Sequence, residues 1–101
     1  MTPVDRPDHS TMAELRAAID VLDDELIGML ARRLALIENA ARIKQRLGLP
    51  ANIPARVEEV VAKVKQSALR QGFSPELAED MWRIMIAWSI ELEEKHLSGA
   101  V

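Results

Sequence analysis

Residues 12–47 carry apolar side chains at the spacing of one long amphipathic helix. Apolar residues recur along two neighbouring rows of the helix surface: Leu15, Leu22, Met29, Leu36 and Ile43, then Ile19, Leu26, Ala40 and Leu47. This sustained heptad pattern predicts an uninterrupted helix with an apolar seam. Thr11 followed by Glu14 has the form of a capping box at the start of the helix, and Gly48 and Pro50 end it.

Two further helices are predicted after the first. Pro54 suits the first turn of a second helix, which ends at Gly72. The apolar face of this helix comprises Val57, Val60, Val61, Val64 and Ala68. Ser74 and Pro75 form a strong helix start, and the third helix is predicted to run to about Leu97. The sequence shows no strand-like alternation and no internal repeat, so it predicts an all-α fold in one domain over residues 11–98.

The apolar seam of the first helix is interrupted by an arginine, Arg33. A cation in such a row needs an ionic partner, a solvated cavity or a bound anion. Lys44 lies about three turns further on, so the two cations share a face about 20° apart and are separated by about 16 Å. Two long side chains can close that gap around a small acidic ligand. The pattern leaves open the alternative that one or both side chains extend to water.

The length of the first helix predicts a second copy of the chain. At about 1.5 Å per residue the helix is about 54 Å long, whereas a compact domain of this size has a radius of gyration near 13 Å. Two shorter helices cannot cover such a rod, so we expect an obligate homodimer in which the long helices pack on one another. The alternative, a break near residues 29–32, is supported only by Gly28.

Composition excludes several other classes of protein. The chain has 101 residues and a net charge of −3, and with Phe73, Trp82 and Trp88 as its aromatic residues it offers no surface for nucleic acid. Cysteine is absent, which fits a reducing compartment. Residues 1–10, predicted to be a flexible arm, lack the pattern of a signal peptide, and no apolar run has membrane-spanning length. We therefore expect a cytoplasmic protein that binds no membrane.

No metal or organic cofactor is expected either. His9 and His96 have no companion at metal-ligand spacing. The four glycines are isolated, so none forms a phosphate-binding loop.

The third helix combines apolar and polar residues in an unusual way. Residues 81–90 are apolar nearly all round, which predicts burial on most sides. Along one row, Trp82 and Ile86 are followed by Ser89 and Glu93, which are stacked neighbours one turn apart. The alternative is that Ser89 bonds to its own helix and Glu93 lies at the solvated end.

The remaining candidate chemistry is a set of cations without a nucleophile: Arg16, Arg33, Lys44 and Arg56. Arg56 stands near the start of the second helix, where the helix dipole favours an acid. Its position makes more sense if an anion also binds nearby.

These residues, in order, resemble the all-helical AroQ class of chorismate mutases. The resemblance runs from about Met12 to Leu97 and rests on the segments 15–20 and 30–34, on Lys44 and Arg56, and on Ser89 with Glu93. It implies an isomerase of aromatic amino acid biosynthesis, built as an intertwined homodimer with two equivalent sites and no cofactor.

The resemblance also implies roles for individual residues. Arg16 would reach into the partner's site, Arg33 and Arg56 would bind the carboxylates of a dianionic substrate, and Ser89 would lie against it. Helix geometry agrees on one point: Arg16 is about 25 Å from Arg33 and about 100° off its face. The two could therefore share a ligand only across a dimer.

In that family chorismate rearranges to prephenate through a pericyclic transition state, in which negative charge grows on the ether oxygen. Catalysis of this kind comes from holding the compact conformer and from preorganised charge. By resemblance, Lys44 would donate to the ether oxygen, with Glu93 on its other side where the usual bacterial residue is Gln. A carboxyl can donate a hydrogen bond only when protonated. We therefore expect activity to fall as pH rises and Glu93 ionises.

Two departures bear on the choice of substrate. Where common bacterial mutases place an Asp and a Glu that meet the substrate hydroxyl, this chain has Ile53 and Val57. The run 53–57, and Trp88 before Ser89, are more similar to the isochorismate pyruvate lyases, which make salicylate and pyruvate on the same fold. Aminodeoxychorismate mutases are a third relative. Chorismate mutase is favoured because it is the commonest activity on this scaffold.

A non-catalytic interpretation also stands. The chain could be a helical dimerisation module in which Arg33 fixes the register of pairing.

Overall fold

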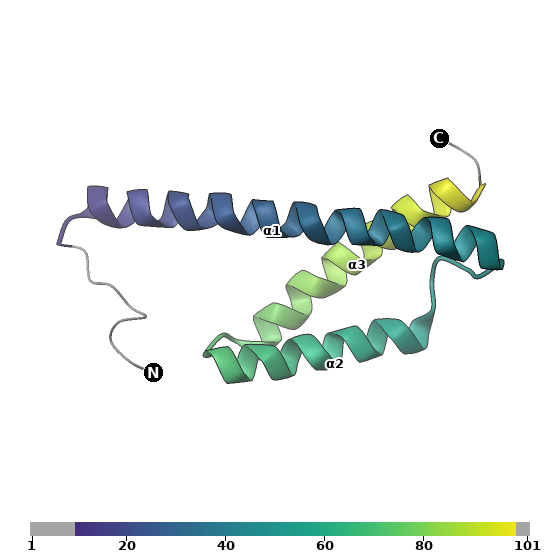
Figure 1. Ribbon diagram of the computed structural model, residues 1–101. Helices are drawn as coiled ribbons and strands as arrows, with labels where there is room; N and C mark the ends of the chain where they lie inside the picture. The colour runs from purple at the N-terminus through teal and green to yellow at the C-terminus, as the bar shows by residue number, and fades with distance from the viewer. Residues whose placement is uncertain (1–9, 99–101) are drawn as a thin grey trace. The chain divides into compact units, whose positions relative to one another are not determined.

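The protein's computed structural model describes residues 10–98. In chain order its helices are α1 (Met12–Leu47), α2 (Pro54–Gln71) and α3 (Pro75–Ser98), and the described residues contain no strand (Figure 1). The predicted all-α fold with three helices and a very long first helix is confirmed. The predicted flexible arm lies, except for Ser10, outside the described residues, as does His9.

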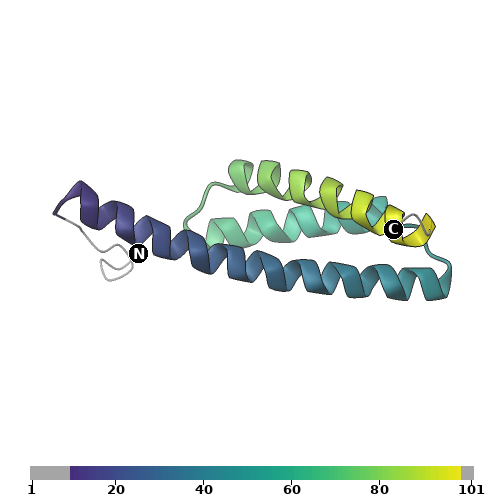
Figure 2. The same cartoon turned by 90° about the horizontal axis from the view of Figure 1, so that it is seen from above.

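The chain divides into two compact units, one ending at Ala35 and the other beginning at Leu36. The N-terminal unit consists of the first part of α1. The C-terminal unit contains the last turns of α1 together with α2 and α3, and in two views α2 and α3 lie side by side (Figures 1 and 2). The single domain over residues 11–98 stays a prediction.

Side-chain caps begin α1 and α3, as their sequences predicted. The Glu14 N–H donates to Thr11 Oγ1 at 3.1 Å, and the Thr11 hydroxyl donates to Glu14 Oε1 at 3.1 Å. At α3, the Leu77 N–H donates to Ser74 Oγ at 3.1 Å. Caps of this kind stabilise a helix by about 1 kcal/mol.

Glycines in the left-handed conformation end α1 and α2. Gly48 has φ 70°, and the Leu49 N–H donates to the Lys44 carbonyl at 2.8 Å, while the Gly48 N–H donates to the Gln45 carbonyl at 3.4 Å. This pair of bonds is the Schellman motif, which turns the chain back alongside the helix it has just left. Gly72, with φ 75°, ends α2 with the same arrangement.

A small apolar core holds the C-terminal unit together. Its buried apolar residues are Ala41, Ala51, Val61, Ala68, Ala78 and Ile86. The predicted face of α2 is confirmed, because Val61 and Ala68 are buried and the other three positions are half-buried. Most core side chains are alanines, so the helices approach closely but remove little apolar surface from water.

An ionic network joins α2 to α3 at the surface. The Arg83 guanidinium donates to both carboxylate oxygens of Glu58, at 3.0 and 3.1 Å, and to Glu79 at 2.8 Å. Lys65 lies 3.1 Å from Glu79. The hydrogen bonds from Arg83 lower the pKa of Glu58 and of Glu79, and the two carboxylates raise the pKa of Arg83. Because the groups are exposed, water screens much of this attraction.

Both units leave apolar rows uncovered. In α3, Leu77, Met81, Ile84 and Trp88 follow one another along one side and are 44–72% exposed, so the predicted burial of residues 81–90 on most sides is wrong for the single chain. In the N-terminal unit the seam residues Leu15, Ile19, Leu22, Leu26 and Met29 are 38–63% exposed. Within residues 10–98 no helix is apolar over a length sufficient to cross a membrane.

Candidate active site

A part-buried ion pair joins α1 to α3 within the C-terminal unit. Lys44 Nζ donates to Glu93 Oε2 at 2.6 Å. Lys44 belongs to the last turn of α1, where a cation complements the helix dipole. The Lys44 side chain is 19% exposed and that of Glu93 5%. The structure thus brings together two of the predicted catalytic residues, in surroundings where a charge-assisted hydrogen bond is strong.

Glu93 continues the inward row of α3 that the sequence indicated. Ile86, Ser89 and Glu93 are 9%, 7% and 4% exposed, and Trp82 is half-buried. The alternative in which Glu93 lies at a solvated helix end is therefore wrong. Ser89, one turn before Glu93, presents its hydroxyl on the same buried row.

The Lys44 ammonium has a second acceptor in the segment between α1 and α2. Its Nζ donates to the main-chain carbonyl of Ala51 at 2.8 Å, and Ala51 is 5% exposed. An ammonium has three N–H donors and no acceptor, so these two contacts leave one donor. The sequence interpretation missed Ala51, because a backbone carbonyl carries no residue-type signal. The only available signal was Gly48, four residues after Lys44, which turns the chain back.

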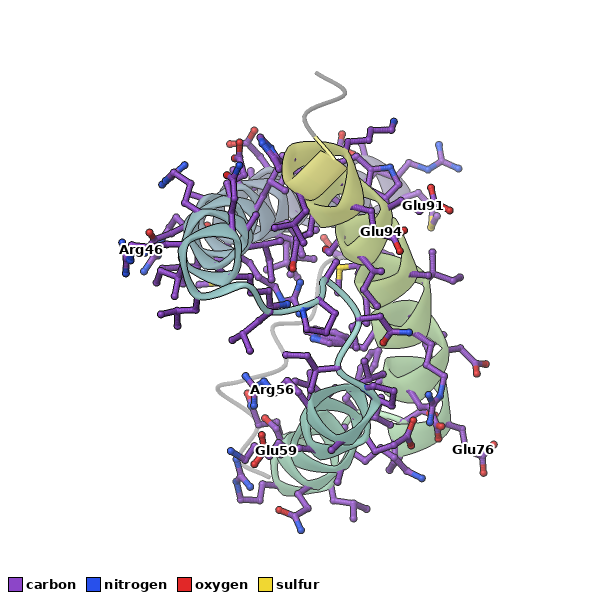
Figure 3. All side chains as sticks on the ribbon, turned by 90° about the vertical axis from the view of Figure 1, so that its right-hand side faces the viewer. Arg46, Arg56, Glu59, Glu76, Glu91 and Glu94 are labelled. Atoms are coloured by element: carbon purple, nitrogen blue, oxygen red, sulfur yellow. The ribbon has the colours of Figure 1, made fainter. Side chains whose placement is uncertain are left out.

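Arg56, predicted to bind a substrate carboxylate, is paired with a residue of its own helix. Its NH1 group donates to Glu59 Oε1 at 2.6 Å, and its side chain is 59% exposed; Figure 3 shows the two side by side on α2. The hydrogen bond from Arg56, with the charge of Lys63, lowers the pKa of Glu59. The sequence predicted an anion near Arg56, and in the structure that anion is the Glu59 carboxylate. The spacing of three residues along a helix could have indicated this pair from the sequence.

The start of α2 is apolar where the resemblance would place acids. Ile53 is the N-cap, with φ −119° and no side-chain cap, and the first turn contains no acidic residue. Val57 lines an open pocket of about 280 Å³ between α2 and α3. Its other lining residues are Asn52, Pro54, Glu58, Arg83, Ile86, Ala87 and Ile90. Most of the exposed pocket wall is therefore apolar, with Glu58 and Arg83 paired to each other at its edge.

The two remaining predicted site residues lie in the N-terminal unit. Arg16 is exposed, and Arg33 is half-buried and engaged in an interaction of its own. Their predicted roles with Lys44 and Arg56 stay predictions. Among residues 10–98 no group of three or more His, Asp or Glu side chains is placed to hold a metal ion.

Comparison with known proteins identifies the family. The sequence profile of the family described as chorismate mutase type II matches residues 15–94. Chorismate mutases are isomerases, and Lys44 and Glu93, 2.6 Å apart, both lie within the residues that match this family. The chain is a member of the chorismate mutase type II family, which confirms the resemblance to the AroQ class.

Individual relatives differ in length and in name. The T-protein of Enterobacter agglomerans is 36% identical over 72 residues, which make up 71% of this chain and 19% of the relative. The chain thus spans about a fifth of that protein's length. The chorismate mutase of Methanocaldococcus jannaschii is 26% identical over 86 residues, 85% of this chain and 87% of the relative. The 4-amino-4-deoxychorismate mutase of Streptomyces venezuelae is 28% identical over 91 residues, 90% and 88% of the two chains.

Proposed function

We propose that this protein is a chorismate mutase that rearranges chorismate to prephenate in aromatic amino acid biosynthesis. The observation that carries the proposal is the part-buried contact between Lys44 and Glu93, 2.6 Å apart, in a chain of the chorismate mutase family. The reaction is unimolecular: the ether C–O bond breaks while a C–C bond forms within the same molecule. It needs no nucleophile, no redox partner and no cofactor.

In this proposal Lys44 donates a hydrogen bond to the ether oxygen, where negative charge grows as the C–O bond breaks. Donors fixed in advance in water-poor surroundings stabilise such charge most effectively. Glu93, when protonated, donates to the same oxygen from the other side, and Ser89 lies against the substrate. The low exposure of Glu93 and Ser89 supports a site from which water is largely excluded.

The two carboxylates of the substrate are bound by Arg33 and Arg56, and Arg16 comes from the partner subunit of a homodimer. The uncovered apolar rows support the dimer: one lies along the N-terminal unit, and another along Leu77, Met81, Ile84 and Trp88 of α3. Exposed contiguous apolar surface of this kind marks an interface. Holding both carboxylates also selects the compact conformer in which the reacting carbons approach each other.

A side-by-side assay tests the function. The purified protein is given chorismate and isochorismate separately, and chorismate loss and salicylate fluorescence are followed. The proposal predicts rapid chorismate turnover with little salicylate, and the Lys44→Met variant should lose most of the activity. Efficient salicylate release from isochorismate, with slow chorismate turnover, would replace the proposal by a lyase.

That lyase is the second candidate, and one observation favours it. Ile53 and Val57 are apolar, and the first turn of α2 holds no acid to meet a substrate hydroxyl. Isochorismate carries its hydroxyl at a different ring position, so an apolar wall here suits it. The same wall disfavours an aminodeoxychorismate, because the carboxylate in the lining of this pocket, Glu58, is already paired with Arg83 and would have to leave it to bind a ring ammonium.

Subunit mixing tests the shared site. Arg16→Ala and Arg33→Ala homodimers should each be weakly active, while exchanged heterodimers regain one site with both arginines. Each heterodimer should therefore have about half of the wild-type activity, and because random exchange of equal amounts makes about half of the dimers heterodimers, the mixture should reach about a quarter. No recovery after subunit exchange has been confirmed by mass would show that each site is built from one chain.

A further inference from the structure

We propose that the main-chain carbonyl of Ala51 is the positioning group of the site, holding the Lys44 ammonium in place whatever the protonation state of Glu93. The inference rests on the proposed function of Lys44 as the donor to the substrate. It starts from the two acceptors of Lys44 Nζ, Ala51 O at 2.8 Å and Glu93 Oε2 at 2.6 Å. They come from different elements, the segment between α1 and α2 and the helix α3.

The two acceptors fix the orientation of the ammonium group. A lysine side chain has many rotamers, and an ammonium turns freely about its last bond unless its N–H groups are held. With two of three N–H groups bound to the protein, the third has one direction left. A donor that is already aligned loses no further freedom when the substrate binds, which is the condition for effective electrostatic catalysis.

The Ala51 carbonyl can hold Lys44 with undiminished strength throughout the reaction. Glu93 is a strong acceptor for Lys44 while it is ionised, but the proposed function requires it to be protonated and to donate to the substrate oxygen. A protonated carboxyl still accepts through its carbonyl oxygen, but it loses its negative charge, so its hydrogen bond with Lys44 becomes weaker. A backbone carbonyl has no protonation step in this pH range. The Ala51 bond therefore persists when the Glu93 bond weakens.

The local sequence explains how the carbonyl reaches Lys44. Lys44 occupies the position of the Schellman motif whose own carbonyl accepts the Leu49 N–H, at 2.8 Å. Lys44 therefore binds the segment that follows α1 at two points: its main-chain carbonyl accepts from Leu49, and its side chain donates to Ala51. Ala51 is 5% exposed, and its small side chain lets the segment lie close to the helices. A larger buried side chain at this position would push the carbonyl away.

The bond itself can be observed by NMR without substrate. In protein labelled with ¹⁵N in lysine and ¹³C at the alanine carbonyl, a scalar coupling across the hydrogen bond should join Lys44 Nζ to the Ala51 carbonyl carbon. The coupling should be present in the wild type and remain in Glu93→Gln. Absence of the coupling in the wild type, or its loss in Glu93→Gln, overturns the proposal. A protein that turns over neither chorismate nor isochorismate overturns the proposed function instead, and the coupling then still decides whether Ala51 holds Lys44.

A matched pair of variants connects the bond to catalysis. Ala51→Leu places bulk at the buried position, and Ala55→Leu makes the same change at an exposed position on α2. We expect Ala51→Leu to lose the coupling and to lower kcat at least about tenfold, the order that a hydrogen bond from a charged group is worth, with a much smaller change in KM. Ala55→Leu should keep the coupling and the wild-type kcat. Loss of the coupling in a folded Ala51→Leu with unchanged kcat would also overturn the proposal; if that variant does not fold, the coupling in Glu93→Gln still decides.

Discussion

Lys44 Nζ and Glu93 Oε2 lie 2.6 Å apart, although the two residues are 49 positions apart in the sequence. Because Glu93 is 4% exposed, removing its cation leaves a carboxylate buried without its main partner. We expect Lys44→Met to lower the free energy of unfolding by about 3 kcal/mol. Glu93→Leu in the same chain should restore much of that loss. Urea unfolding of both single variants and of the double variant measures the coupling between the two residues.

Arg46→Met is the control for this cycle. Arg46 is exposed on the same last turn of α1 (Figure 3), so its removal should change the free energy of unfolding by less than about 0.5 kcal/mol. Strictly additive effects of the Lys44 and Glu93 substitutions would contradict an energetically important ion pair.

The Glu93 carboxyl should also make the catalytic activity depend on pH. A carboxyl donates a hydrogen bond only in its protonated form, so the hypothesis that Glu93 donates to the substrate oxygen predicts that kcat/KM falls as pH rises. In Glu93→Gln the amide donates at every pH, and the fall should disappear. Steady-state kinetics from acid to neutral pH measure both profiles. Glu94→Gln, an exposed neighbour on α3, should behave as the wild type; a flat profile in the wild type would exclude Glu93 as the donor.

Arg56 is held by Glu59 at 2.6 Å, and a substrate carboxylate has to compete with that contact. Replacing Glu59 by Gln should free the guanidinium and lower KM by up to about fivefold, the range for an exposed ion pair. Because Arg56 lowers the pKa of Glu59, the pair is formed above that value and is lost as pH falls through it. The advantage of Glu59→Gln should therefore vanish at low pH. Glu91→Gln, an exposed residue of α3 with the same change in net charge, should leave KM unchanged.

The helices could be predicted from the sequence because their signals are local. Apolar periodicity and the residues Thr11, Gly48, Ser74 and Gly72 set where each helix begins and ends, and the structure confirms these helices within a residue or two. The same periodicity placed Ser89 and Glu93 on one row beside a buried stretch but left open whether Glu93 was solvated, and the structure shows both residues buried.

Two kinds of feature could not be predicted in the same way: contacts made by the main chain at a turn, and the identity of the surface that covers an apolar helix face. The Ala51 carbonyl reaches Lys44 only because the chain reverses at Gly48, and a backbone group has no sequence signature. The exposure of Ile84 and Trp88 shows the other limit. Periodicity identifies an apolar face, but it does not say whether the same chain or another one covers that face.

Gly28 within α1 and Gly48 directly after it should respond in opposite ways to replacement by alanine. A Cβ at Gly28 or at Gly48 would meet no other atom within 4 Å, so only the backbone differs: Gly28 is helical, whereas Gly48 has φ 70°. Gly28→Ala should raise the free energy of unfolding by about 0.5–1 kcal/mol. Gly48→Ala should lower it by about 1 kcal/mol, the penalty of a left-handed residue that carries a Cβ. Chemical denaturation of the two variants measures the change in the free energy of unfolding for each. The same change in both variants would contradict the role of the left-handed conformation of Gly48.

The network around Arg83 should make the packing of α2 on α3 sensitive to acid. The hydrogen bonds from Arg83 lower the pKa of Glu58 and Glu79 below the ordinary value of 4.5. A carboxyl whose pKa is lower in the folded state stabilises that state fully above its unfolded pKa, and the contribution is lost as pH falls through the folded value. Arg83→Met should therefore reduce stability at neutral pH and have little effect well below pH 4.5. Urea unfolding at the two pH values measures the difference, with Arg70→Met, an exposed cation of α2 outside the network, as the control. A loss that is the same at both pH values would mean that Arg83 acts through the packing of its aliphatic stem rather than through its charge.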